Sequence, residues 1–282
     1  MEYRDFGRAN VKVSAIGMGT YFDPLALMGA HLFGYHRSKE DKIAALKRGL
    51  ELGINLIDTA EIYGTEPLVA EAMEGHRRDE IFVATKASPH HLGHKSLAKA
   101  AEGSLRRLRC SYIDLYQIHH PNPMVPIRET MGIMEKLVDD GKIRHIGVSN
   151  FSLKQTTEAE EALSRHELVS NQVEYSLKVR RIETGLLPYC ERNNIAVMSY
   201  RPVAHGGLTR PSDDLRSTVD KISQKYGGKT PAQIALNWLL TKSKVVFPIP
   251  RASRPTRVTE DAGAVGWSLE AADMARLEAG VR

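Results

Sequence analysis

The sequence predicts an α/β fold, a (β/α)8 TIM barrel preceded by an N-terminal β-hairpin. Short apolar runs alternate with longer amphipathic stretches, which is typical of βα units around a parallel sheet, and eight such runs can be counted. The chain has 282 residues, close to the roughly 250 that one such barrel commonly uses. We therefore expect residues 1–282 to form one domain. An open doubly wound sheet is the alternative, but the segment GMGTYF has only the first two glycines of the G-x-G-x-x-G pattern.

The strands and loops follow one another in a regular order. A hairpin is expected over residues 3–14, with GRAN as its turn. The strand candidates are residues 14–20, 54–58, 81–85, 113–118, 143–149, 168–175, 195–200 and 245–250. Residues 22–40 and 201–215 have the composition of long loops, which commonly carry function when they lie at strand ends. A last helical pattern covers residues 269–280.

Two of the helices between the strands have clear end signals. The helix expected over residues 39–53 repeats its apolar residues at helical spacing, and Gly53 supplies its stop. Another is expected over residues 230–242, where Thr230 is the N-cap and Pro231 lies in the first turn.

Composition narrows the classes of function. The formal charge of +5 comes from 39 basic and 34 acidic residues spread along the chain, which suits an anionic ligand but does not indicate a nucleic-acid partner. No run approaches the roughly 20 apolar residues of a membrane span. Cys110 and Cys190 give no disulfide framework, which favours a reducing, cytoplasmic setting. Nothing in the chain requires an oligomer, so we expect a monomer.

Four polar residues lie at or just beyond the ends of three successive strand candidates. They are Asp58, Tyr63, Lys86 and His119. Because the ends of parallel strands share one face of the sheet, residues far apart in sequence can converge there. This convergence makes an active site the leading hypothesis.

The four residue types together can protonate a carbonyl oxygen. A tyrosine hydroxyl titrates near pH ~10, so it needs a neighbouring cation to become a useful acid. Lys86 can be that cation and is expected to lower the pKa of Tyr63 by roughly two to three units before desolvation subtracts its part, because a charge pair is worth on the order of 4 kcal/mol. Asp58 would hold Lys86 charged, and His119 would donate a hydrogen bond to the carbonyl oxygen. The set has no paired nucleophile and base, so its chemistry fits carbonyl reduction with a separate source of hydride.

Five motifs in this order closely resemble the aldo-keto reductase superfamily. They are INLIDTAEIYG, VATKAS, DLYQIHHP, GVSNF and NQVEY. The resemblance implies a (β/α)8 barrel that binds NADPH in an extended form and reduces aldehydes and ketones. It also implies that Asp58, Tyr63, Lys86 and His119 are the catalytic tetrad, with Tyr63 as the proton donor.

The same resemblance assigns the cofactor contacts. It implies that Ser149, Asn150 and Gln172 bind the nicotinamide carboxamide, and that Tyr200 stacks on the nicotinamide ring. The loop with Gly206 and Gly207 would lie over the pyrophosphate. The remaining candidates are Arg251, Ser253, Arg254 and Arg257 for the adenosine 2'-phosphate, with Glu260 and Asp261 near the adenine. Three arginines beside a serine suit a phosphate dianion, so NADPH is preferred over NADH.

The chain departs from the family at two places. Asp261 stands where the family often has an asparagine that faces the adenine. The chain also ends soon after its last helical pattern, without the long C-terminal loop that covers the pocket in many members. The pocket is therefore expected to be open, with Tyr21, Phe22 and His120 at its wall, and to accept small carbonyl substrates broadly and weakly.

Other interpretations remain open. Each residue of the tetrad taken alone is ordinary loop or turn material, and only the set in its order favours catalysis. Some related barrels, including the potassium channel β-subunits, bind the cofactor tightly and serve partly as binding partners. Lys86 could instead form a Schiff base, although Asp58 would oppose it by keeping the amine protonated. His90, His91 and His94 have metal-ligand spacing, but Pro89 and Gly93 interrupt a helix there, so no metal is expected.

Overall fold

Eight parallel strands form one sheet in chain order. The protein is described from a computed structural model, in which residues 1–21, 38–204 and 213–280 are described. The strands are β3 (Met18–Gly19), β4 (Leu56–Asp58), β5 (Phe82–Ala87), β6 (Ile113–Ile118), β7 (Ile143–Ser149), β8 (Leu168–Glu174), β9 (Ala196–Tyr200) and β10 (Val246–Pro248). The strands lie side by side in the order in which they occur along the chain. The first strand, β3, and the last, β10, are therefore the two edges that must meet if the sheet closes into a barrel.

The closure itself is a short seam between the first and last strands. Gly19 forms a parallel bridge with Arg251. The Gly19 amide donates to the Pro250 carbonyl at 2.8 Å, and the Ala252 amide donates to the Gly19 carbonyl at 3.0 Å. The sheet is therefore a closed (β/α)8 barrel, as the sequence predicts, and not an open sheet.

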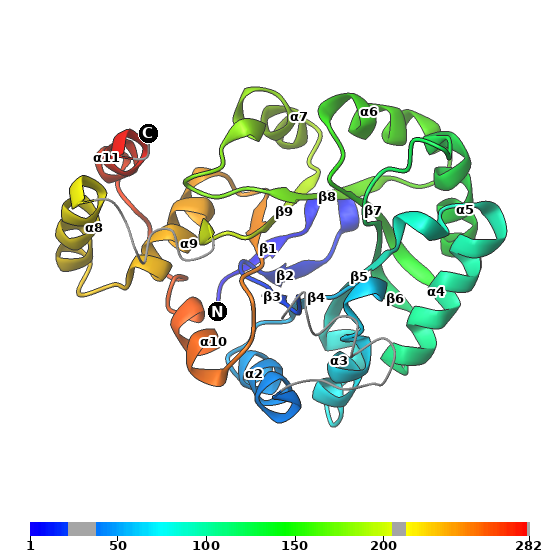
Figure 1. The fold of residues 1–282 in the computed structure, drawn as a ribbon, viewed down its shortest axis with the longest axis horizontal. Helices are drawn as coiled ribbons and strands as arrows, with labels where there is room; N and C mark the ends of the chain where they lie inside the picture. The colour runs from blue at the N-terminus through cyan, green and yellow to red at the C-terminus, as the bar shows by residue number, and fades with distance from the viewer. Residues whose placement is uncertain (22–37, 205–212, 281–282) are drawn as a thin grey trace.

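Helices surround the barrel on its outer face (Figure 1). The α-helices are α2 (Lys39–Glu51), α3 (Glu66–Met73), α4 (His94–Leu108), α5 (Ile127–Asp139), α6 (Leu153–Ala162), α7 (Leu186–Arg192), α8 (Asp213–Lys225), α9 (Pro231–Lys242), α10 (Pro255–Ala262) and α11 (Ala271–Gly280). Short 3-10 helices are η1 (Gly7–Ala9), η2 (Glu61–Tyr63), η3 (Arg78–Glu80), η4 (Pro89–His91) and η5 (Arg181–Thr184). Helices α8 and α11 pack against each other at one edge.

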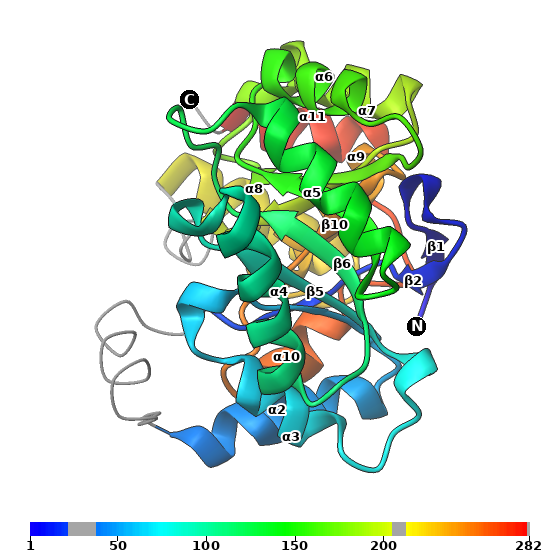
Figure 2. The same ribbon diagram turned by 90° about the vertical axis from the view of Figure 1, so that its right-hand side faces the viewer.

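The predicted hairpin is confirmed and closes one end of the barrel. Strands β1 (Tyr3–Asp5) and β2 (Lys12–Ser14) are antiparallel and lie at the barrel end next to the N-terminus (Figure 2). Between them Phe6 is fully buried, and its ring centre lies 5.0 Å from those of both Phe82 and Phe247. Gly7 is required here, because its φ is +53° and a Cβ would lie 2.6 Å from the Val169 carbonyl oxygen. The amino-terminal end of the barrel is thereby filled with side chains, so it holds no pore.

The helix signals in the sequence are confirmed. Thr230 caps α9 through a full capping box, in which its side chain accepts from the Gln233 amide. Helix α2 ends at Glu51, and Gly53 follows with a φ of +82°. The predicted loop bounds are partly wrong, since residues 39–40 and 213–215 are helical. Residues 22–37 and 205–212 of these predicted loops lie outside the described residues.

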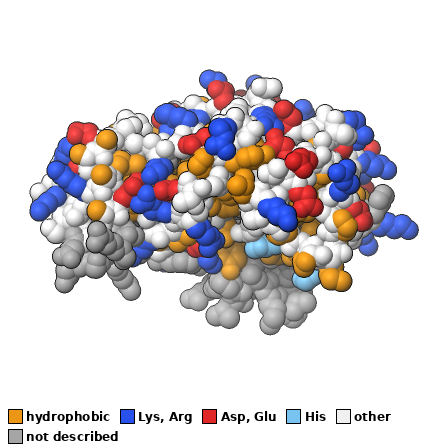
Figure 3. All heavy atoms as spheres, turned by 90° about the horizontal axis from the view of Figure 1, so that it is seen from above, with side chains coloured by type: hydrophobic (Ala, Val, Ile, Leu, Met, Phe, Trp, Pro, Cys, Tyr) orange, Lys and Arg blue, Asp and Glu red, His pale blue; other side chains and the backbone are white. Residues whose placement is uncertain are grey.

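The surface mixes charges of both signs. Figure 3 shows lysine and arginine side chains interspersed with acidic ones over one face, with no large area of a single sign. Across the described residues, we find no helix that is long and apolar enough to cross a membrane. Cys110 and Cys190 are both free thiols.

Candidate active site

The barrel brings the four predicted polar residues together at the carboxyl ends of its strands. Asp58 ends β4, Lys86 lies near the end of β5, and His119 directly follows β6. Tyr63 ends the short helix η2, which follows β4. The Tyr63 hydroxyl lies 3.3 Å from His119 Nε2, and Lys86 Nζ lies 5.0 Å from the centre of the Tyr63 ring. Residues separated by up to 61 positions thus form one cluster.

Asp58 and Lys86 form a buried ion pair beneath this cluster. Lys86 Nζ donates to Asp58 Oδ2 and to the Thr59 carbonyl oxygen, both at 2.8 Å. Asp58 Oδ1 accepts from Gln172 Nε2 at 2.7 Å. Burial raises the pKa of Asp58 and lowers the pKa of Lys86, while the charge of each partner opposes the shift of the other. The hydrogen bonds therefore offset part of the cost of removing two charges from water.

The expectation that Lys86 lowers the pKa of Tyr63 is wrong for this structure. Burial raises the pKa of Tyr63 well above its ordinary value, and the negative charge of Asp58 adds to the rise. The charge that acts in the opposite direction belongs to Arg201. Lys86 is hydrogen-bonded to Asp58, whose negative charge lies beside the phenol as well and raises its pKa. Tyr63 is consequently a neutral phenol at physiological pH.

His119 is a neutral imidazole. Burial, and then the nearby positive charge of Lys86, lower its pKa to about 2. Its Nδ1 is buried without a hydrogen-bond partner among the described residues. A buried N–H without an acceptor is rarer in proteins than a buried acceptor without a donor. We therefore infer that the single ring proton is on Nε2, which faces the Tyr63 hydroxyl.

Glu61 anchors the short helix η2, which carries Tyr63. Glu61 is not among the site residues predicted from the sequence. Glu61 Oε2 accepts from the Ser88 amide at 2.9 Å, and its Oε1 lies 2.9 Å from His91 Nδ1. These contacts tie η2 to the end of β5, one strand away. His90 and His91 are both exposed, and His91 contacts this carboxylate. A single acidic residue in a loop has no sequence pattern that would have identified it.

Four predicted cofactor residues gather beside the tetrad. Ser149 and Gln172 lie on the neighbouring strands β7 and β8, and the Ser149 hydroxyl donates to the Gln172 carbonyl at 3.0 Å. Asn150 has a φ of +63° and its Nδ2 donates to the His119 carbonyl at 3.0 Å. The Tyr200 hydroxyl donates to Asn150 Oδ1 at 2.9 Å. The amide and hydroxyl groups at this edge can therefore donate to and accept from a carboxamide.

The predicted phosphate-binding residues follow the seam of the barrel. Arg251 pairs with Gly19 at the seam, and Arg254 is the exposed N-cap of α10. Ser253 lies between them and is partly exposed. Arg257 Nη1 donates to Glu260 Oε2 at 2.7 Å, so part of its charge is neutralised. The positive charge is therefore concentrated in one short segment at the start of α10.

The two acidic residues predicted near the adenine differ in exposure. Glu260 is partly exposed, whereas Asp261 is buried. Burial raises the pKa of Asp261 to about 7, against the charge of Arg257. Asp261 is thus partly protonated near neutral pH, and its protonated form can donate a hydrogen bond as asparagine does.

The substrate-pocket candidates are placed in part. The ring of Tyr21 lies 5.0 Å from that of Tyr63, and the ring of His120 stacks on His119 at 5.2 Å. Both therefore border the tetrad. Phe22, Gly206 and Gly207 lie outside the described residues.

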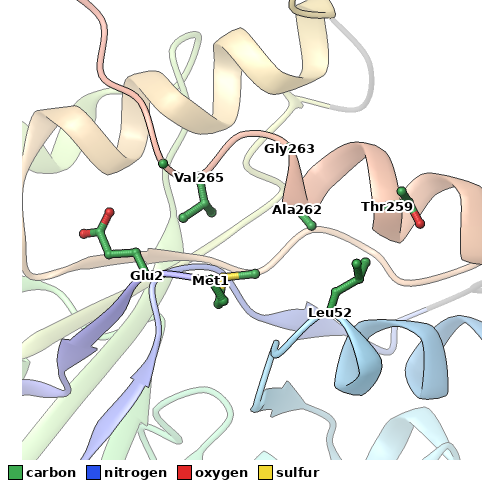
Figure 4. Close-up of a pocket in the computed structure, with 8 residues that line it drawn as sticks. Met1, Glu2, Leu52, Thr259, Ala262, Gly263 and Val265 are labelled. Atoms are coloured by element: carbon green, nitrogen blue, oxygen red, sulfur yellow. The ribbon is translucent and has the colours of Figure 1, made fainter.

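A separate cavity of about 510 Å³ lies at the opposite end of the barrel. Figure 4 shows that Met1 and Glu2 from the N-terminus, Leu52 after α2, and residues at the end of α10 line it. None of the tetrad contributes to it. Its position does not favour it as the reaction site, since active sites of such barrels lie at the carboxyl ends of the strands.

Comparison with known proteins identifies similar chains. A model of the Aldo/keto reductase family matches residues 26–281. The chain is 35% identical over 272 residues to the methylglyoxal reductase YeaE of Escherichia coli (strain K12), covering 95% of this chain and 91% of that protein. The solved structure of the thermostable aldo-keto reductase Tm1743 with the inhibitor epalrestat has a TM-score of 0.89 and 34% identity, covering 99% of this chain and 100% of that one. A Klebsiella pneumoniae aldo/keto reductase in complex with NADP and acetate has a TM-score of 0.83 and 35% identity, covering 98% and 94%.

Removing Lys86 should destabilise the fold far more than removing an exposed cation. We expect Lys86→Met to lower the free energy of unfolding by about 3 kcal/mol, because Asp58 is then left buried without its counter-ion. Arg77→Met is the matched control, since Arg77 pairs with Asp79 at the surface and should change little. Urea unfolding of both variants measures the difference. Equal small losses would show that the buried pair is not a structural requirement.

The neutral His119 should make stability fall in mild acid. Its pKa is about 2 in the folded chain and roughly 6.5 when unfolded, so its contribution is complete above pH ~6.5 and decreases as pH falls below that value. Between pH 6.5 and 5 we expect the wild type to lose roughly 1.5 kcal/mol more than His119→Gln. Burial also lowers the pKa of His145 to about 4. His145 contributes equally to the pH dependence of both proteins, so its effect cancels when their unfolding free energies are compared. Parallel pH profiles of unfolding free energy would contradict the assignment.

Proposed function

Because the chain belongs to the aldo/keto reductase family, we propose that it reduces aldehydes and ketones to alcohols with NADPH, with Tyr63 as the proton donor. The observation that carries the proposal is the placement of Tyr63 and His119 over the buried Asp58–Lys86 pair. The methylglyoxal reductase that this chain resembles acts on a small carbonyl compound, as its name states.

The residues at the carboxyl end of the barrel fit a nicotinamide cofactor. Ser149, Asn150 and Gln172 would hold the carboxamide, and the half-buried Tyr200 would lie against the ring. Asn150 and Tyr200 are hydrogen-bonded to each other, so cofactor binding would exchange that bond for one to the carboxamide. NADP is bound in the Klebsiella pneumoniae structure, which supports the choice of cofactor. When bound, NADPH supplies the hydride that adds to the carbonyl carbon.

His119 and Tyr63 would act on the carbonyl oxygen. Their polar atoms are 3.3 Å apart, so one oxygen can contact both. The neutral His119 donates from Nε2 and stabilises the negative charge that develops on the oxygen. Tyr63 then transfers its proton to that oxygen, which completes the alcohol. Burial raises the pKa of Tyr63, but the alkoxide that hydride addition forms is a much stronger base than a phenolate, which favours the transfer.

Lys86 would stabilise the phenolate that remains after the transfer. Its ammonium lies 5.0 Å from the centre of the Tyr63 ring and is completely buried. Its ammonium donates to Asp58 and to the Thr59 carbonyl, and it would have to lose a proton before the amine could attack a carbonyl carbon, which the charge of Asp58 opposes. These contacts oppose a Schiff-base mechanism. Borohydride trapping with an aldehyde tests that alternative directly.

Replacing Tyr63 should remove turnover while leaving cofactor binding intact. We expect wild type to oxidise NADPH with a broad panel of small aldehydes and ketones at weak affinity, and Tyr63→Phe to lose on the order of 10²-fold or more in kcat. The Kd for NADPH should stay within about twofold, since the change removes only the hydroxyl.

Tyr3→Phe is the control, because it removes a hydroxyl that donates to the Gly53 carbonyl outside the site. One carbonyl compound far better than the rest would contradict broad specificity. Tight NADPH binding without any reduction would favour a binding or regulatory role.

The arginines at the start of α10 should select NADPH over NADH. We expect Arg254→Ala to raise the Kd for NADPH by about tenfold and to leave the Kd for NADH unchanged, because only NADPH carries the 2'-phosphate. Arg106→Ala, which removes an exposed arginine from α4, controls for the loss of net charge. Fluorescence titration with both cofactors measures the four constants. An equal effect of Arg254→Ala on both cofactors would overturn the assignment.

A further inference from the structure

Arg201 is a charged residue at the active-site end of the barrel that the tetrad and the cofactor assignment leave unexplained. It directly follows Tyr200, the last residue of β9, and therefore lies at the carboxyl end of the strands. Its φ is +51°, a left-handed conformation that residues with side chains rarely adopt and that occurs often at functional sites. The Ala204 amide donates to its carbonyl at 2.9 Å and closes the turn.

The guanidinium of Arg201 shares one carboxylate with a second arginine. Glu174 ends β8 and is in register with Tyr200 on β9. Arg201 Nη1 lies 3.5 Å from Glu174 Oε1, and Arg181 Nη2 lies 3.6 Å from Oε2. Both contacts are long, and the two arginine side chains are 46% and 69% exposed. The three residues together leave a positive charge at the mouth of the site, in contacts weak enough to be exchanged for a ligand.

Arg201 is also close to the reacting groups. Its guanidinium carbon lies 5.9 Å from the centre of the ring of Tyr200, the residue predicted to stack on the nicotinamide. Tyr200 is joined to the His119 carbonyl through Asn150 by hydrogen bonds of 2.9 and 3.0 Å, so Arg201 directly follows a residue of the network beside the tetrad. In line with this position, the charge of Arg201 opposes the rise that burial causes in the pKa of Tyr63. A group attached to a carbonyl that is bound at Tyr63 would therefore be near this charge.

We propose that Arg201 binds an anionic substituent of the substrate, and that the preferred substrates are aldehydes and ketones that carry a carboxylate. The inference rests on the proposed reduction at Tyr63. Within the broad range of aldehydes and ketones expected there, it names the class that binds best. A guanidinium presents paired donors that match the two oxygens of a carboxylate, and a shared, exposed partner such as Glu174 leaves some of those donors to solvent.

The test compares two aldehydes of nearly equal shape, 4-formylbenzoate and 4-formylbenzamide, at saturating NADPH. We expect the wild-type KM to be roughly five- to tenfold lower for the anionic compound, and Arg201→Gln to remove that preference. Arg106→Gln is the matched control, since it removes an equal charge from an exposed position on α4, away from Glu174, and should keep the preference. Arg201→Lys should restore part of it, and added salt should reduce it in the wild type.

Three outcomes would overturn the proposal. The wild type could show equal KM values, or Arg201→Gln could leave the preference intact. Alternatively, Arg201→Gln could raise the Kd for NADPH and affect both aldehydes equally, which would assign Arg201 to a cofactor phosphate. Absence of NADPH oxidation with either aldehyde would reject the reductase function instead. Calorimetric Kd values for the two aldehydes on the NADP-bound chain would then still decide whether Arg201 selects the anion.

Discussion

The buried ion pair between Asp58 and Lys86 constrains everything around it. Two charges removed from water are tolerated only when their hydrogen-bonding capacity is satisfied, and here the Thr59 carbonyl and the Gln172 amide complete that set. Strands β4, β5 and β8 must therefore be held at fixed relative positions. A closed barrel provides this rigidity, because every strand is hydrogen-bonded on both sides.

The chemistry of the site follows from its low polarity as much as from its residue types. Burial keeps Tyr63 protonated and His119 uncharged, so both can donate a proton or a hydrogen bond at neutral pH. Lys86 is paired with Asp58 before the reaction, and in the proposed mechanism its charge would stabilise the negative charge that appears on the phenol. The proposed mechanism thus keeps the site nearly neutral until hydride addition to the carbonyl carbon moves the electrons of the C=O π bond onto the substrate oxygen.

Much of the fold and the tetrad could be predicted from the sequence, because both depend on local patterns. Strand-like runs with polar residues at their ends place Asp58, Lys86 and His119 on one face, and Gly53 and Thr230 mark helix ends by backbone geometry. The pKa of Tyr63 could not be predicted, since it depends on burial and on which charge lies nearest in space. Glu61 and Arg201 were missed for the same reason. Each is a single charged residue that follows a strand, and its partners come from another part of the chain.

The seam between β3 and β10 can couple ligand binding to closure of the barrel. It consists of a few backbone hydrogen bonds around Gly19, and Arg251 belongs to it while also beginning the segment with the exposed Arg254. A dianion bound by this segment would hold the residues that follow β10 against β3. Occupancy of the phosphate site would then be coupled to closure of the cylinder, so amide exchange at Gly19 and Ala252 would slow in proportion to ligand saturation.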